Sequence, residues 1–272
     1  MIDTDIRLSA LHIYPVKSMR GIALQSAELD ALGLRHDRRW MVVDEQGQFL
    51  TGRQLPRLLL IQPALSPAGD LTLVFPDGTH LAVPPAAPDA PRLPVQVWRD
   101  TVEALAVDGA VDAALSDFLG RPCRLVSFAE DVVRPVDPDY ARPGDRTGFA
   151  DGFPLLLISE ASLADLNARL PAPLPMARFR PNLVVSGCAP YAEDDWREIR
   201  IGDIPFELVK PCSRCVMTTT NPDTGAREGQ EPLRTLATYR RRGNKVYFGQ
   251  NVVHRGHGLL RVGDAVTVRA RA

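Results

Sequence analysis

Two cysteines three residues apart are the side chains of this sequence best suited to chemistry. Cys212 and Cys215 lie in KPCSRCVMTTTNPDTG, the segment from Lys210 to Gly225. Such a pair can be a redox couple, half of a zinc site, one metal ligand beside a bystander, or two packed thiols. Arg214 directly precedes Cys215. A fixed cation beside the sulfur favours the thiolate, which is the form that binds metal or attacks.

The surrounding residues disfavour two of these interpretations. A structural zinc ion needs four ligands, but a second Cys-x-x-Cys is missing, and His254 and His257 do not have zinc-finger spacing. A thioredoxin-like couple opens a helix, whereas the β-branched run VMTTT after Cys215 predicts a strand. A single metal ligand and a pair of packed thiols both stay open.

Lysine is rare in this chain, and one lysine lies in a possible anion site. The chain has 29 arginines but only three lysines, at positions 17, 210 and 245. Lys17 and Ser18 follow a predicted strand in IYPVKSMRG, where an ammonium, a hydroxyl and free backbone amides suit a phosphate. An isolated arginine is usually a solvated surface charge. As a set, however, four arginines could complete a cradle for an anionic cofactor: Arg38 and Arg39 in HDRRW, and Arg178 and Arg180 in RFRPN.

The overall composition is nearly neutral, so an anion site would depend on charges clustered locally. The 272 residues include 32 basic and 33 acidic side chains, with a net charge of −1, so no global field attracts nucleic acid or an anionic membrane. The longest apolar run, FPLLLI, is too short to cross a bilayer, and no leader-like segment opens the sequence. Four cysteines are too few for a disulfide scaffold. We therefore expect a cytoplasmic protein.

Short strands separated by turns dominate the first hundred residues. The loops DEQGQ, SPAGD and PDGT are Gly-containing hairpin connections, and they predict a curled β-meander. The proline-rich stretch from Val83 to Pro94 is expected to be an exposed loop, because proline disrupts central strands and helices. The strand-like segment VQVWRDTVEALAV follows it.

Three helices are predicted among further strands. AVDAALSDFLG has one apolar face and ends at Gly120, SEASLADLNARL has Ser159 as a candidate N-cap, and PLRTLATYRRR opens at Pro232. IGDIP and VGDAV each predict a strand, a Gly-Asp turn and a second strand. The second half is thus predicted to be another β-barrel or sandwich decorated by helices.

Several segments that occur in order along the chain resemble one family. They are YPVKSMRG, GLRHDRRWMVVDEQGQFLTGRQLPRL, DGFPLLLISEASLADLN, RFRPNLVVSG, YAEDDWREIRIGD, PCSRCVMTTTNPDTG and YFGQNVV. Together they are similar to the MOSC family with its N-terminal β-barrel domain, and within it to the amidoxime-reducing components of mitochondria and their bacterial counterparts. The resemblance implies a mainly-β fold of two barrel-like domains, residues 1–120 and 121–272, with a cofactor cleft between them.

The resemblance also implies a molybdenum cofactor, a pterin dithiolene that carries a phosphate. In the family the second cysteine of the CSRC segment ligates molybdenum, a role that carries over to Cys215. A soft thiolate is a suitable ligand beside dithiolene sulfurs. The implied cofactor contacts are Lys17, Ser18, Arg38, Asp151, Gly152, Arg180, Asn182, Ser213, Arg214 and Asn251, the last at a position where eukaryotic relatives have a tyrosine.

The activity implied is removal of oxygen from small N-hydroxylated substrates such as amidoximes, hydroxylamines and N-hydroxylated bases. Some bacterial relatives carry a C-terminal ferredoxin domain and eukaryotic relatives an N-terminal membrane anchor, and neither is recognised in this sequence. We therefore expect no membrane and no nucleic-acid polymer as partners, and a separate electron donor of the ferredoxin, flavodoxin or cytochrome type with its reductase. The alternatives are a cofactor carrier and a sulfur-transfer protein with a persulfide on Cys215. Three acids of YAEDDW are expected to be turn or surface residues rather than catalysts: Glu193, Asp194 and Asp195.

Overall fold

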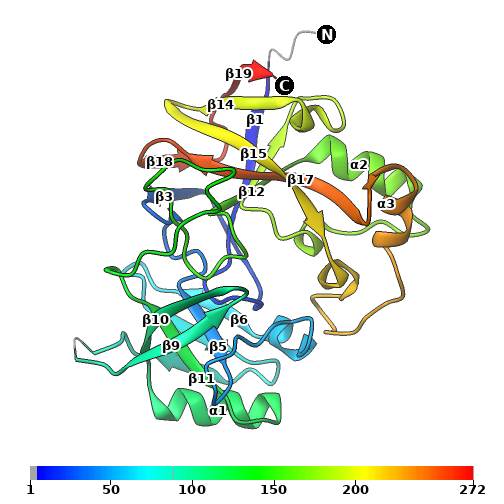
Figure 1. Cartoon of the computed structure of the whole chain (residues 1–272). Helices are drawn as coiled ribbons and strands as arrows, with labels where there is room; N and C mark the ends of the chain where they lie inside the picture. Colours follow the sequence, from blue (N-terminus) through cyan, green and yellow to red (C-terminus); the bar gives the residue numbers. More distant parts are fainter. Residues whose placement is uncertain (1–4, 88, 272) are drawn as a thin grey trace.

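Strands form most of the regular structure of this chain. The computed structural model describes residues 5–87 and 89–271. Figure 1 shows the strands in two groups, one above the other, with α1 (Gly109–Leu119) beneath the lower group. The helices α2 (Glu160–Arg169) and α3 (Leu233–Tyr239) lie beside the upper group. The prediction of a mainly-β fold with a few helices is confirmed.

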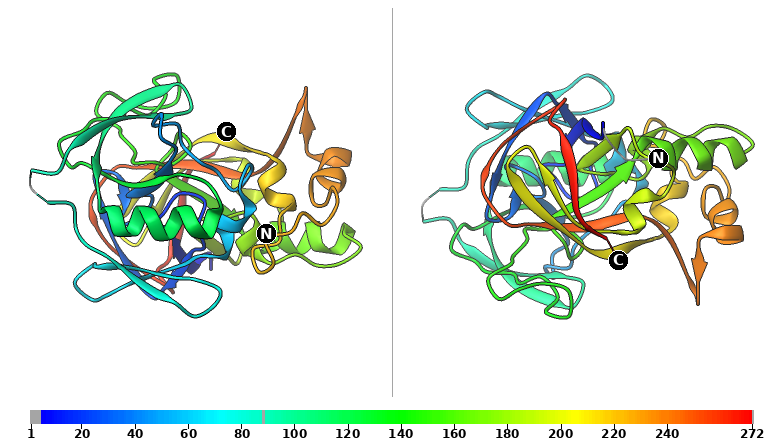
Figure 2. Two further views of the ribbon diagram at one scale, coloured as in Figure 1. Left: turned by 90° about the horizontal axis from the view of Figure 1, so that it is seen from below. Right: turned by 90° about the horizontal axis from the view of Figure 1, so that it is seen from above.

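One large sheet dominates the upper group of strands. Its neighbours are antiparallel except for β12 and β13, which run parallel. Seen from above, the strands of this group curl round on themselves (Figure 2). In the described residues the order is β19 (Val266–Arg271), β14 (Trp196–Ile201), β15 (Ile204–Arg214), β17 (Lys245–His254), β12 (Leu155–Ser159), β13 (Leu183–Ser186), β1 (Arg7–Ile13) and β2 (Ile22–Leu24), with β16 (Arg241–Arg242) paired to β17.

Three smaller sheets complete the strands of the described residues. The four-stranded sheet has the order β5 (Trp40–Val43), β11 (Arg124–Phe128), β10 (Asp100–Ala106) and β9 (Arg92–Val97). The meander predicted over the first hundred residues is confirmed only for β6 (Gln62–Leu65), β7 (Leu71–Val74) and β8 (His80–Val83). The last sheet joins β18 (Gly258–Arg261), β3 (Ser26–Asp30) and β4 (Gly33–Leu34).

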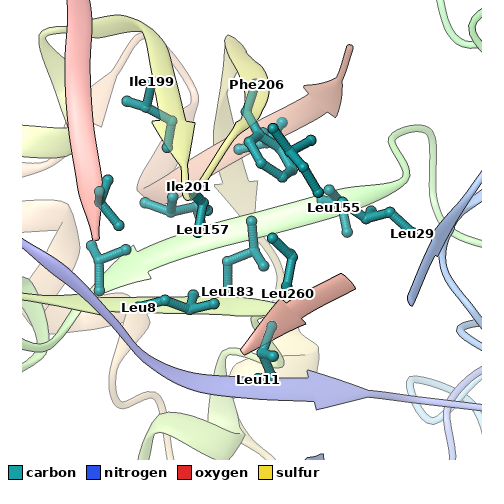
Figure 3. Close-up of a cluster of buried hydrophobic side chains, with 14 of the residues drawn as sticks. Leu8, Leu11, Leu29, Leu155, Leu157, Leu183, Ile199, Ile201, Phe206 and Leu260 are labelled. Atoms are coloured by element: carbon teal, nitrogen blue, oxygen red, sulfur yellow. The ribbon is translucent and has the colours of Figure 1, made fainter. Parts of the chain in front are cut away.

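The core of the upper group is formed by aliphatic side chains from strands far apart in the sequence. Figure 3 shows Leu8 and Leu11 of β1 close to Leu157 and Leu183, with Phe206 of β15 above them. All five are buried. Because successive strand residues point to opposite faces, alternation selects which side chains enter this core.

The edge strand β5 of the four-stranded sheet is buried on both faces. Met41 and Val43 of β5 pack into one cluster, while Val42 between them packs into another. The second cluster also contains Val111 and Leu115 of α1. A strand covered on both faces reads as a continuous apolar run. This explains why WMVV lacks the polar alternation of a surface strand.

The predicted helix ends are confirmed. Asp108 caps α1 by accepting hydrogen bonds from the amides of Ala110 and Val111, and Gly120 ends it with a left-handed φ of 70°. The Ser159 side chain accepts a hydrogen bond from the Ser162 amide at the start of α2. Pro232 directly precedes α3.

Two local predictions are wrong. The run VMTTT is not a strand, because β15 ends at Arg214 and Val216–Thr219 forms a 3-10 helix, η4, closed by hydrogen bonds to the carbonyls of Cys215 and Met217. Local hydrogen bonding here overrides β-branched propensity. The proline-rich stretch is only partly a loop, because its last three residues begin β9. That strand lies at an edge of its sheet, where proline is tolerated.

Strand pairing crosses the boundary expected at residue 120 in both directions. β1 and β3, from the first half, pair with β13 and β18 of the second half. β11, which lies after the boundary, pairs with β5 and β10. The division into residues 1–120 and 121–272 stays a prediction. The pairing shows that the two strand groups exchange segments of the chain.

The remaining helical turns are short. They are the 3-10 helices η1 (Pro56–Leu60), η2 (Met176–Arg178) and η3 (Ala192–Asp194). Glu193 lies in η3 and has only 1% of its surface exposed. Glu193 was expected to be a turn or surface residue. It does lie in a turn, but it is not on the surface.

Candidate functional site

A cavity lined by both strand groups brings the predicted site residues together. Loops after β1, β4 and β9 line it from the first half of the chain, and β15, β17 and the segment before β12 line it from the second. All the predicted contacts are among its lining residues: Lys17, Ser18, Arg38, Asp151, Gly152, Arg180, Asn182, Ser213, Arg214, Cys215 and Asn251. Their roles toward a cofactor stay predictions.

The two cysteines reach the cavity at the end of a distorted strand. The pairing of β15 with β17 shifts register between Leu208 and Lys210 and again between Pro211 and Ser213. Such bulges re-aim side chains. Cys212 and Cys215 both line the cavity, although side chains three apart on a regular strand would point to opposite faces. The half-buried Cys215 precedes η4, and its thiol has no hydrogen-bond partner among the described residues.

The guanidinium of Arg214 is directed at Cys212 rather than at Cys215. Its Nη1 donates to the Cys212 sulfur at 3.0 Å, and its Nη2 donates to the carbonyl of Phe179. The expected proximity of a cation to a thiol is therefore present, but at the first cysteine of the motif. The Cys215 sulfur keeps its position in the cavity without that contact.

Lys17 is buried and already paired with an acid. Its Nζ donates to Asp151 Oδ1 at 2.5 Å and to the Phe149 carbonyl at 2.8 Å. Only 6% of the lysine side chain is exposed, against 66% for Asp151. Burial lowers the pKa of Lys17, and the Asp151 carboxylate opposes that change. The predicted phosphate-grasping lysine thus fixes the Asp151 segment against the cavity wall.

Two arginines of the cavity pack on one buried tyrosine ring. The guanidinium carbons of Arg38 and Arg180 lie 4.3 and 4.1 Å from the centre of the Tyr14 ring. Arg38 also donates to both carboxylate oxygens of Asp37 at 2.6 Å, while Arg180 donates to the Met19 carbonyl at 2.6 Å. Burial lowers the pKa of Arg180 to about 10 and raises that of Tyr14 to about 12. Both arginines are therefore held rigidly, and Arg180 has no carboxylate paired with it among the described residues.

The backbone is in the left-handed region at four positions of the cavity. Ser18, Arg38, Trp98 and Arg180 have φ values of 70°, 49°, 59° and 56°. The described residues contain only two other non-glycine residues with positive φ. Each such residue costs on the order of 1–3 kcal/mol, and such strain gathers at functional sites. The strain marks the same cavity as the predicted residues do.

The sequence prediction missed further side chains that line the cavity, among them Thr51, Arg53 and Trp98. Arg178, which also lines it, was predicted as part of an anion site but not as a cofactor contact. Trp98 lies in the turn between β9 and β10, and its indole nitrogen donates to Asp151 Oδ1 at 3.1 Å. Arg53 stacks on the Trp98 ring at 4.5 Å. A Trp-Arg turn in the middle of VQVWRDTVEALAV was the available signal.

The lining has a strongly cationic donor set. Asp151 is its only acid in the described residues, against six cations, Lys17, Arg38, Arg53, Arg178, Arg180 and Arg214. Cationic donors that line a cavity fit a polar anionic ligand. The Cys215 thiol adds one soft metal ligand to this lining.

The two asparagines and Gly152 have different surroundings. Asn182 is buried and links strands, since its Oδ1 accepts from the Leu156 amide at 3.2 Å and its Nδ2 donates to the His12 carbonyl at 3.1 Å. Asn251 donates to the Lys210 carbonyl at 3.2 Å. A Cβ on Gly152 would meet no atom within 4 Å. Gly152 therefore leaves open space, while Asn182 fixes the cavity wall.

Protein ligands alone form no metal cluster here. In residues 5–87 and 89–271, no group of three or more His, Cys, Asp or Glu side chains is placed to hold a metal ion. A metal at Cys215 would need most of its ligands from elsewhere, as a dithiolene cofactor provides. None of the described helices has the length and apolar character that a membrane crossing requires.

Comparison with known families matches both halves of the chain. Residues 5–122 match the MOSC N-terminal beta barrel domain, and residues 144–267 match the MOSC domain. The two matches flank the loop that follows β11. The cavity is lined from both matched regions, as the family resemblance in the sequence implied.

Curated relatives cover nearly the whole chain. It is 41% identical to "Mitochondrial amidoxime-reducing component 1" of Homo sapiens, over 95% of this chain and 82% of that protein. It is 35% identical to "Mitochondrial amidoxime reducing component 2" of Bos taurus, over 86% and 72%. A "Molybdenum cofactor sulfurase" of Oryza sativa subsp. japonica is 35% identical over 90% of this chain but only 32% of its own length.

Proposed function

The chain belongs to the MOSC family, and on that premise we propose that it is a molybdenum-cofactor-dependent reductase of small N-hydroxylated compounds. The observation that carries the proposal is the cavity itself, where the Cys215 thiol shares one space with six cationic side chains. Relatives named as amidoxime-reducing components support the reaction class.

The reaction converts an N–OH group into an N–H group. For a hydroxylamine, R–NHOH, two electrons and two protons give R–NH₂ and water. The bound molybdenum centre would supply the two-electron chemistry of this reduction, and the protein would bind and orient it. The electrons come from a separate donor protein of the ferredoxin, flavodoxin or cytochrome type.

The side chains of the cavity bind and orient the cofactor. Cys215 provides the thiolate ligand, and the guanidinium groups of Arg178 and Arg214, which line the cavity, would donate to polar atoms of the pterin and its phosphate. Arg180, which lacks a paired carboxylate, is positioned to neutralise negative charge. Lys17 acts indirectly by holding Asp151, and with it Trp98, at the wall.

A second candidate function is sulfur transfer or cofactor carriage. It is favoured by the similarity to the rice molybdenum cofactor sulfurase, of which this chain matches about a third. In that case Cys215 would carry a persulfide, or the cavity would bind the pterin without turnover. These functions predict a thiol modification or bound cofactor without reduction.

The test is reconstitution of the purified chain with molybdenum cofactor. We expect bound molybdenum by metal analysis, and reduction of benzamidoxime with dithionite-reduced methyl viologen as electron source. Cys215→Ala should lose both. Cys188→Ala is the control, since it removes a half-buried thiol outside the cavity lining. Retention of metal and turnover by Cys215→Ala would refute the site, and bound molybdenum without turnover in the wild type would favour the carrier.

A further inference from the structure

A tight hairpin next to the cavity carries an exposed cluster of cations. β16 and the start of β17 are joined by a two-residue turn, Gly243 and Asn244. The basic hairpin is defined here by the three cationic side chains on either side of this turn, which are all exposed: Arg241, Arg242 and Lys245. In Figure 2 this orange segment projects from the body of the molecule in both views. The projection leaves the cluster open to a partner.

The charge of the basic hairpin is uncompensated. Within residues 5–87 and 89–271, no ion pair involves any of its three side chains. Neighbouring arginines differ, since Arg240 pairs with Asp194 at 2.6 Å and Arg234 with Glu231 at 2.7 Å. In a chain with a net charge of −1, the hairpin is therefore a local positive patch.

The hairpin is also rigid. A two-residue connection with a left-handed first residue, Gly243 at φ 60°, is the tight form that matches strand twist. Arg241 Nε donates to the Gly243 carbonyl at 2.9 Å, so this side chain is tied to its own turn. Preorganised charges lose little conformational entropy when a partner binds.

Strand register places the basic hairpin beside the Cys215 segment. Val246 of β17 pairs with Arg214 on one side and with Arg241 on the other. Adjacent strands lie about 4.8 Å apart, so the β16 backbone is about 10 Å from that of β15. The residue after Arg214 is Cys215, and the residue before Val246 is Lys245. A protein bound to the hairpin would sit next to the proposed metal ligand.

An exposed apolar residue lies at the same place. Val216 directly follows Cys215 and has 37% of its surface exposed, which makes it one of few large exposed hydrophobic residues in the described chain. Protein interfaces commonly surround an apolar contact with polar and charged residues. The Cys215 segment thus offers an apolar contact beside a cationic rim.

We infer that the basic hairpin docks an acidic redox protein that delivers electrons to the cavity. The inference rests on the proposed reductase function and adds the docking face and the charge of the partner. Two electrons leave the donor protein for each substrate reduced, the two protons come from solvent, and no covalent bond joins the proteins. Complementary charge accelerates such encounters and suppresses wrong partners.

Charge number favours a protein over other anionic partners. Recognition of an anionic membrane surface usually uses clusters of four to eight basic residues, and nucleic acid binding uses many phosphate contacts. Three cations on a short hairpin are fewer than either needs. A small protein with an acidic face can be steered and oriented by a few complementary charges.

The experiment compares two electron sources on the cofactor-loaded protein. One is an acidic [2Fe–2S] ferredoxin kept reduced by its reductase and NADPH, and the other is dithionite-reduced methyl viologen. The test variant is R241E/R242E/K245E. The matched control is R197E/R261E/R269E, which makes the same change in charge at exposed positions on β14, β18 and β19.

We expect the hairpin variant to lose about tenfold or more of its ferredoxin-driven kcat/KM, within the range of electrostatic effects on association, and to retain its dye-driven rate. The control variant should lose less than about half of the ferredoxin-driven rate, as expected for screened distant charges. The wild-type ferredoxin-driven rate should fall steeply with salt. If the charge-reversed hairpin does not fold, R241Q/R242Q/K245Q should show the same direction with a smaller loss.

Three results would overturn the docking inference. The first is an equal loss in the hairpin and control variants. The second is loss of the dye-driven rate together with the ferredoxin-driven rate, which would place the hairpin in the cofactor site. The third is binding of the chain to phosphatidylserine vesicles that the hairpin variant abolishes while ferredoxin-driven turnover persists. Absence of dye-driven turnover in the wild type would instead contradict the proposed function, and ferredoxin affinity measured by calorimetry would still test docking.

Discussion

At the residue scale, Asp151 organises the mouth of the cavity. Its carboxylate accepts from Lys17 and Trp98, and Arg53 lies 4.0 Å away. Although 66% of the side chain is exposed, that surface lies in the cavity, whose walls desolvate the carboxyl and would raise its pKa. The charge and hydrogen bond of Lys17, the Trp98 hydrogen bond and the charge of Arg53 together outweigh this effect and hold the pKa of Asp151 well below its usual range. One acid thus connects three residues distant in sequence.

We predict that Asp151→Asn destabilises the chain by about 1–2 kcal/mol, because the buried Lys17 ammonium loses its anionic partner while part of the pair remains screened by solvent. Urea unfolding measures the change. The double variant K17M/D151N should recover part of the loss, because an uncharged side chain needs no counter-charge. If the two single changes simply add in the double variant, the two side chains do not interact as described.

At the element scale, β17 approaches β12 so closely that one position requires glycine. Gly249 has φ 79°, and a Cβ there would lie 2.6 Å from Ile158 Cγ1 and 2.9 Å from the Leu157 carbonyl oxygen. Asn251, two residues further along, lines the cavity. The close approach of these strands therefore fixes one wall of the site.

Gly249→Ala should destabilise the fold through two effects. Left-handed strain adds about 1–2 kcal/mol, and overpacking adds about 1–3 kcal/mol. Gly243→Ala is the matched control, because it has φ 60° but open space around its Cβ position. Chemical denaturation of both variants isolates the packing effect as their difference. Equal losses would contradict a steric requirement at Gly249.

The start of α2 contacts a buried carboxyl in η3, that of Glu193, which the proposed reaction does not use. Glu193 Oε1 accepts from the Ser162 hydroxyl at 2.7 Å and from the Ser159 amide at 3.1 Å. Its Oε2 is buried without a hydrogen-bond partner among the described residues. Burial raises the pKa of Glu193, against the effect of these hydrogen bonds. A neutral carboxyl is the form that this position favours.

The raised pKa of Glu193 predicts how stability depends on pH. Because the folded pKa exceeds the unfolded one, the stabilisation is complete below the unfolded pKa and is lost as pH rises through the folded pKa. Glu193→Gln should remove the loss of stability that Glu193 causes as pH rises. The unfolding free energy of the variant minus that of the wild type should therefore increase with pH. Urea titrations from pH 4 to pH 8 measure it. A difference that does not vary with pH would show that folding leaves the pKa of Glu193 unchanged.

At the scale of the whole molecule, the exchange of strands makes the two groups interdependent. β1 supplies Leu8 and Leu11 to the core of the upper group, and it pairs with β13 in the large sheet. The loop after β1 then carries Lys17 to the cavity. The same crossing of the chain that completes the core also assembles the site.

A cut at the expected domain boundary should therefore prevent folding. The fragment 121–272 lacks β1 and β3, which leaves the edges of β13 and β18 unpaired. We predict that it gives no cooperative thermal transition by circular dichroism, and that coexpression with residues 1–120 restores a folded complex. The intact chain is the control and should unfold in one transition. Independent folding of 121–272 would show that the exchanged strands are dispensable.

Local patterns in the sequence were sufficient for much of the fold class and for a set of residues that the structure brings to one cavity. Helix ends at Ser159 and Gly120 and the Gly-Asp turns depend on neighbours in sequence, and they were predicted correctly, as was the part of the meander formed by β6, β7 and β8. The family motifs placed Cys215 and the other predicted contacts, all of which line one cavity. A motif can assign residues to a site because it keeps them at a fixed spacing in the sequence.

Only the tertiary structure decided the contacts that hold those motifs together. Lys17 meets Asp151 across 134 positions, and Trp98, in the turn between β9 and β10, donates to the same Asp151 in the other half of the chain. The β-branched run after Cys215 became a 3-10 helix because its hydrogen bonds close locally where β15 ends. Sequence periodicity reports which side chains are buried. Which distant strands and loops meet is determined by packing and pairing of the whole chain, so spacing alone could not reveal it.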